Sequence, residues 1–296
     1  MRRETFHTPG DVRLNLDLPA GKIEIESADT DDTHVELEAF SANEQVREMV
    51  ETARIEEVRR GDGHEVIVQV RTRHGVWISF SRGPDVRLGT PEMRLRVRCP
   101  RGAELEVRTK SADIEARGDY GRADVKTASG DVSVERGAQA DVKTASGDVH
   151  VERIDGTLDV KSASGDVAVG AVEGPATIQL VSGDLWVREA NESLSANTVS
   201  GDQRIEAVGQ GRVELKAISG DISVGVRRGT RLFVDANTVS GSTSSEVELG
   251  DSPADDGPEE GPLVEVFAKT VSGDVRIERA PSAPARSEHT GLSEQA

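Results

Sequence analysis

Residues 123–135 read A-D-V-K-T-A-S-G-D-V-S-V-E, residues 140–152 read A-D-V-K-T-A-S-G-D-V-H-V-E, and this repetition decides the fold. Four later copies change more of their residues but keep the Ser-Gly-Asp core in place. Self-similarity at a fixed period indicates a repeat architecture. The anchoring serines follow one another at steps of 17, 18, 18, 18 and 19 residues: Ser129, Ser146, Ser164, Ser182, Ser200 and Ser219.

Each copy has the pattern of two or three short strands joined by tight turns. Before the serine, Ala123, Val125 and Thr127 recur at period two, which marks one face of a strand, and Val132 and Val134 follow the Gly-Asp pair in the same way. Such a short unit cannot bury its own apolar face, but stacked copies can. Stacking in register pairs equivalent strands in parallel, so the sequence predicts an all-β fold, a parallel β-solenoid of about 18-residue coils.

The solenoid is expected over residues 103–280, with each copy lying on the next copy in the chain. Nine anchors, from Ser111 to Ser272, then predict a rod roughly 40 Å long at about 4.8 Å per coil. Residues 244–262 contain seven acids and no Lys or Arg, so we expect an acidic surface insertion. The tail at 281–296, which is rich in Pro, Ser and Ala, is expected to be disordered.

Residues 1–102 read as a β-rich capping region. Apolar side chains alternate from Val12 onward, as in strands. A capping-box pattern and helical spacing predict one helix at about 42–53, and Gly61-Asp62-Gly63 predicts a hairpin over 55–70.

An Arg-rich loop is predicted at 71–101, where eight arginines accompany two acids. One interpretation is a site for an anionic ligand or an acidic partner, because basic side chains lie beside aromatic rings. The other is a solvated hairpin whose arginines pair with the protein's own carboxylates. The candidate partner-binding residues are Arg71, Arg73, Trp77, Phe80, Arg82 and Arg87.

Stacking also places one aspartate per copy above the next, and stacked carboxylates repel one another. One interpretation is that each aspartate caps its own turn by a bond to a backbone N–H and is screened by water and nearby lysines. The other is a calcium column, as in aspartate-bearing β-roll repeats. The residues concerned are Asp131, Asp148, Asp166, Asp184, Asp202 and Asp221.

The net charge of −18 disfavours binding to nucleic acid or to anionic lipid, since both need a basic face. Cys99 is the single cysteine, so no intramolecular disulfide can form. The chain shows no apolar run of membrane-spanning length and no signal-peptide pattern at its start. We therefore expect a soluble cytoplasmic protein that does not insert in a membrane.

Catalytic motifs are missing from the sequence. It contains no H-E-x-x-H, no G-x-S-x-G and no phosphate-binding G-x-x-x-x-G-K, and its six histidines are scattered singly. We therefore expect no enzymatic activity, no catalytic residues and no cofactor.

The S-G-D-V phrase at steps of 17 to 19 residues, led by V-x-x-P-x-G at 97–102, resembles a bacterial family of unknown function described as putative adhesins with β-strand repeats. The resemblance covers roughly residues 10–280. It implies a parallel β-solenoid, and it implies no enzymatic activity and brings no catalytic residues.

The function expected from these features is a non-enzymatic scaffold or protein-binding module with protein partners. One alternative is a surface adhesin, and another is a self-associating protein that forms filaments through open solenoid ends. A carbohydrate-active enzyme is disfavoured, because the acids are periodic and alternate with lysines instead of forming one cluster.

Overall fold

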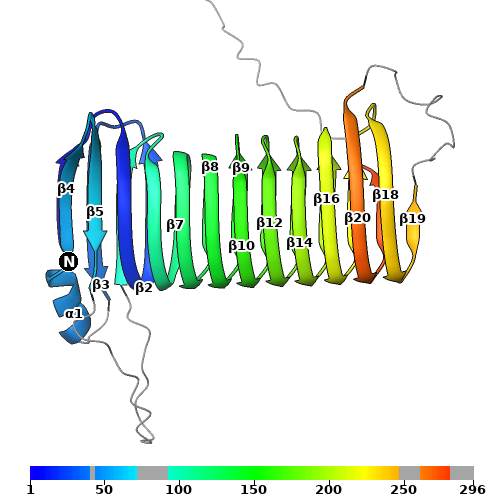
Figure 1. The fold of residues 1–296 in the computed structure, drawn as a ribbon. Coiled ribbons are helices and arrows are strands. Elements are labelled where there is room, and N and C mark those ends of the chain that lie inside the picture. The colour runs from blue at the N-terminus through cyan, green and yellow to red at the C-terminus, as the bar shows by residue number, and fades with distance from the viewer. Residues whose placement is uncertain (41–43, 72–92, 247–260, 281–296) are drawn as a thin grey trace, which may run out of the picture.

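The computed structural model describes residues 1–40, 44–71, 93–246 and 261–280, and everything below concerns these residues. They form a parallel β-solenoid with an N-terminal β region that contains one short helix, as the sequence predicts (Figure 1). The insertion at 247–260 and the tail at 281–296 lie outside the described residues, so their predicted disorder stays a prediction.

Each regular coil contributes two strands, one on each side of the Ser-Gly-Asp corner. The predicted stacking is confirmed, because Val142 pairs in parallel with Val125 on one side and with Val160 on the other, and all three are buried. β8 (Val132–Ser146) bends and contributes to both sides. The first face, before the corner, continues with β10 (Leu158–Ser164), β12 (Ala176–Ser182), β14 (Leu194–Ser200) and β16 (Gly211–Ser219), and the second face comprises β9 (Val149–Ile154), β11 (Val167–Val172), β13 (Leu185–Ala190), β15 (Gln203–Val208) and β17 (Ile222–Val226).

The corner needs glycine for two reasons, which Gly183 illustrates. Its φ of +122° lies in a region that side chains with a Cβ rarely adopt. A Cβ placed there would also lie 2.2 Å from the carbonyl oxygen of Gly165 in the preceding coil. The close stacking of coils at the corner therefore depends on the absence of a side chain.

The order of the last coils differs from the predicted order along the chain. β20 (Leu263–Ser272) pairs with β16 on one side and with β18 (Arg231–Ser240) on the other, and β21 (Val275–Arg279) lies in the same way between β17 and β19 (Thr243–Ser245). The coil of Ser272 is thus inserted between the coils of Ser219 and Ser240, which Figure 1 shows as the order β16, β20, β18. The expectation that each copy lies on the next one was wrong at this end.

The apolar content of the two copies explains the inserted coil. The inward rows of β18 and β20 are similarly apolar, since Leu232, Val234 and Ala236 pair with Val264, Val266 and Ala268. The copies differ in the second strand, because Val275 and Ile277 of β21 continue the buried inward row. β19 instead carries the exposed Thr-Ser-Ser sequence. A coil covered on both sides buries more apolar surface than a terminal coil, so the more apolar copy is the more stabilising one inside.

The N-terminal region continues the same stack. β2 pairs in parallel with β7, and the other edge of β2 carries β5 and β6. The predicted helix is present with buried Val46 and Val50, and the predicted hairpin is the antiparallel pair of β4 and β5. β2 precedes residue 102 and β7 follows it, and the two strands pair with each other. The predicted domain boundary at 102 stays a prediction. The elements are β1 (Arg2–His7), β2 (Val12–Ala28), β3 (Asp32–Ala39), α1 (Glu44–Glu51), β4 (Arg54–Arg60), β5 (Gly63–Gln69), β6 (Met93–Pro100) and β7 (Glu104–Ser129).

Candidate binding surfaces

The predicted aspartates form a continuous column, which we call the carboxylate column. The Asp131 carboxylate accepts a hydrogen bond from the backbone N–H of Asp148 at 2.9 Å, and Asp148 accepts one from Asp166 at 2.9 Å. The prediction that each aspartate caps its own turn was wrong, because its partner is the N–H of the next coil. The column comprises Asp131, Asp148, Asp166, Asp184, Asp202 and Asp221, and Asp113 and Asp274 extend it by the same bonds.

Among the described residues no lysine forms an ion pair with an aspartate of this column. Lys126 and Lys143 each bind the acid two residues before them, Asp124 and Asp141, at 3.0 Å. The hydrogen bond to Asp141 raises the pKa of Lys143. Among the described residues no group of three or more His, Cys, Asp or Glu side chains is arranged to hold a metal ion. Calcium binding by the column stays a hypothesis.

A row of exposed aliphatic side chains lies on the first face, and the sequence analysis missed it. Ten large hydrophobic residues are exposed in the described part of the chain, and five of them precede the corner serine of successive coils. The pairing of Ser200 with Ser182 and with Ser219 places these residues in neighbouring coils. This aliphatic row comprises, in spatial order, Val181 (51% exposed), Val199 (45%), Ile218 (54%), Val271 (49%) and Val239 (82%).

The fold does not require these aliphatic residues. Ala128, Ala145 and Ala163 are exposed at the same position of three other coils with the same stacking. The sequence contained a signal for the aliphatic row, because later copies read Val-Ser-Gly or Ile-Ser-Gly where three earlier copies read Ala-Ser-Gly. A contiguous exposed apolar row is unusual on a soluble protein, whereas isolated exposed apolar residues are common.

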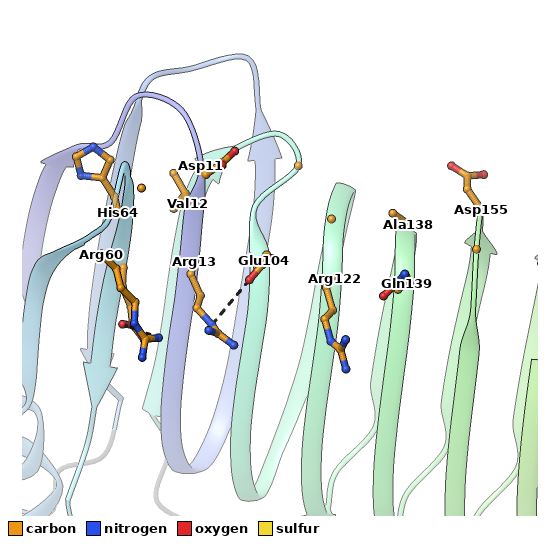
Figure 2. A pocket seen from close by; sticks show the side chains of 15 residues that line it. Asp11, Val12, Arg13, Arg60, His64, Glu104, Arg122, Ala138, Gln139 and Asp155 are labelled. Atoms are coloured by element: carbon orange, nitrogen blue, oxygen red, sulfur yellow. Dashed lines mark ion pairs between the residues drawn. The ribbon is translucent and has the colours of Figure 1, made fainter.

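A separate hollow of about 780 Å³ crosses the strand ends between β5 and β9 (Figure 2). Two ion pairs form between residues of its lining. Arg13 Nε lies 3.9 Å from the Glu104 carboxylate, and Arg60 lies 3.4 Å from Glu65. A charged ligand would have to displace these pairs, so the hollow favours no particular ligand class.

The structure describes only part of the predicted Arg-rich loop. Arg71 is exposed, whereas Arg73, Trp77, Phe80, Arg82 and Arg87 lie outside the described residues, so their role in binding stays a prediction. Arg94 and Arg96 approach Glu24 at 3.8 and 3.0 Å, which fits the interpretation of internal pairing for these two. Burial alone would raise the pKa of Glu24, but hydrogen bonds from Lys22 and Arg96 outweigh it and lower that pKa.

The described histidines do not gather into a reactive cluster. His7 contacts Asp32 at 2.9 Å and His64 contacts Glu57 at 2.9 Å, each as a single pair. His74 and His289 lie outside the described residues. No helix within the described ranges is long and apolar enough to cross a membrane.

The fold and its surfaces define a parallel β-solenoid repeat protein. The family model Toastrack DUF4097 matches residues 11–278, so the chain belongs to this family. None of the curated proteins compared with the chain matches it.

Two solved structures show a similarity of low identity. One is titled a putative adhesin from Bacteroides fragilis, at 13% identity and a TM-score of 0.40, covering 93% of this chain and 96% of that one. The other is titled a putative cell adhesion protein from Clostridium sporogenes, at 10% identity and a TM-score of 0.24, covering 94% and 99%. At these TM-scores neither similarity carries an argument about function.

Proposed function

We propose that this protein is a non-enzymatic scaffold that holds a protein partner on the first face of its solenoid. The observation that carries the proposal is the aliphatic row, because five neighbouring coils expose a large aliphatic side chain where other coils carry alanine. Burial of such a row against a partner is favourable in proportion to the apolar area removed from water.

The partner's chemistry follows from what borders the row. Asp184, Asp202 and Asp221 of the carboxylate column lie three residues beyond Val181, Val199 and Ile218, so acidic groups flank the apolar surface on one side. Coils repeat at about 4.8 Å, and a helix repeats its apolar face about every 5.4 Å, which is a near match. We therefore expect the partner to be an amphipathic helix with basic residues beside its apolar face.

A triple variant tests this proposal without altering the fold. Val181→Ala, Val199→Ala and Ile218→Ala together reproduce the residue that other coils already carry. Binding of a fluorescent amphipathic Leu/Lys helical peptide is measured by anisotropy. The variant should bind about tenfold more weakly or worse, because several methyl and methylene groups per complex lose their burial.

The controls separate apolar contact from charge attraction alone. A peptide of the same composition in scrambled order has the same charge but no apolar face, and it should bind wild type weakly. The reverse variant, Ala128→Val combined with Ala145→Val and Ala163→Val, should strengthen binding of the ordered peptide. Equal binding of both peptides, or no difference between wild type and the triple variant, would contradict the proposal.

The proposal includes a cytoplasmic location. Its support comes from the sequence, in which Cys99 is the single cysteine and no disulfide ties the chain to an oxidising compartment. Fractionation of native cells followed by immunodetection tests this location. Recovery of the protein at the cell surface would favour the adhesin alternative instead.

A further inference from the structure

The two ends of the solenoid are built differently. At the N-terminal end the outermost strands are β1 and β4, which pair antiparallel with β3 and β5 (Figure 1). β4 carries five charged residues among seven, and the Arg2 side chain of β1 donates hydrogen bonds to the carbonyls of Glu51 and Ala53 beside α1. Charged edge strands of this kind resist pairing with another chain.

The C-terminal end exposes its core. In the described part of the chain β18 pairs with β20 alone, and β19 pairs with β21 alone. Leu232, Val234 and Ala236 are only partly buried, whereas their partners on β20 are fully buried. The inward row of the solenoid therefore continues to this end, and no further coil among the described residues covers it.

The free edge of β18, as the described residues show it, carries few of the charges that oppose pairing. Arg231 and Asp235 are its only charged residues. Phe233 is 52% exposed beside Phe267, with ring centroids 5.7 Å apart, and Val239 is 82% exposed. A ten-residue edge strand with five apolar residues and two charges is a template for pairing with another strand.

We propose that a second copy of this chain covers this end, with the two β18 strands paired antiparallel across a two-fold axis. A pair centred on Ala236 uses nearly the whole strand and keeps the inward side chains of both copies on one side. It sets Phe233 opposite Val239 of the second copy and Asp235 opposite Asn237, so the exposed apolar side chains face each other and no like charges do. On the inward side Leu232 faces Ser240 and Val234 faces Thr238.

The protected N-terminal end limits the assembly to two copies. A filament needs both ends to pair, and β1 and β4 carry the charges that oppose pairing. Two C-terminal ends in contact form a closed, isologous interface. This inference gives the expected self-association a defined interface, and it does not depend on the aliphatic row binding a helix.

Sedimentation velocity of the full chain over a wide concentration range tests the inference. Wild type should shift from a monomer of 31.6 kDa to a species of twice that mass as concentration rises. The double variant Phe233→Lys and Val239→Lys places lysine opposite lysine twice, so dimerisation should weaken on the order of a hundredfold. Both side chains are exposed, so the variant should keep the wild-type circular dichroism spectrum.

A charge-reversed pair tests the register. Phe233→Lys combined with Val239→Glu places opposite charges across the same interface, so it should dimerise more strongly than the double-lysine variant. Val58→Lys on β4, at the other end, is the matched control and should dimerise like wild type. A wild type that stays monomeric, species larger than a dimer, or equal dimerisation of the two double variants would each overturn the inference.

Discussion

Replacement of Gly183 by alanine tests whether close contact between coils holds the solenoid together. The new Cβ would lie 2.2 Å from the carbonyl oxygen of Gly165. The backbone there cannot move without disturbing the next pair, since a Cβ on Gly201 would lie 2.0 Å from the carbonyl oxygen of Gly183. The residue would also keep a φ of +122°, which is unfavourable for alanine.

The two contributions can be estimated separately. A non-glycine residue in a sparsely populated backbone region costs roughly 1–3 kcal/mol. Overpacking at a well-packed position costs roughly 1–3 kcal/mol more. Gly183→Ala should therefore lower the free energy of unfolding by about 4 kcal/mol.

Gly61→Ala is the matched control, because Gly61 has a positive φ of +64° but no atom within 4 Å of a new Cβ. It should lower the free energy of unfolding by only about 1 kcal/mol, the backbone contribution alone. Urea unfolding followed by far-UV circular dichroism measures both variants. Equal losses in the two variants would refute the reasoning, because the contact between coils would then contribute nothing.

Three further predictions concern single groups. Burial raises the pKa of Cys99 to about 12, so native protein should resist a thiol reagent at mildly alkaline pH and react only once urea unfolds it; prompt native reaction would contradict this. Hydrogen bonds from the Ser242 backbone and hydroxyl lower the pKa of Asp274 below 3.8, so their stabilisation is present above that pH and lost as pH falls through the lowered value. Proteolysis of β18 and β19 should therefore rise in acid, and Asp274→Asn should abolish this pH dependence. The protein should have the same melting temperature in calcium and in chelator, because one oxygen of each aspartate in the carboxylate column already accepts a hydrogen bond from a backbone N–H. A clearly higher melting temperature in calcium would support a metal site.

Much of the fold could be predicted from local patterns. The period of the Ser-Gly-Asp phrase predicts stacked coils, and the alternation around Val142 predicts which side chains face inward. Both follow from the geometry of a strand, in which successive side chains point to opposite sides. The Arg-rich loop could not be checked in the same way, because most of it lies outside the described residues.

The sequence predicted the aliphatic row and the bonds of the carboxylate column only in part. Alternation assigns Val199 and Ile218 to the outer side, but the sequence does not show how exposed they are. The acceptor role of Asp148 depends on the N–H of a residue 18 positions later, so the local turn sequence could not reveal it.

The amino-acid sequence alone determined that this chain forms a solenoid, because identical short units can bury their apolar rows only by stacking. Only the tertiary structure decided which copies are neighbours. The coils of Ser240 and Ser272 both carry the Thr-Val-Ser-Gly phrase, so the repeat pattern does not say which of them lies next to the coil of Ser219. The more apolar coil lies inside because burial on both sides removes more of its surface from water, and the poorer one is left at the open end.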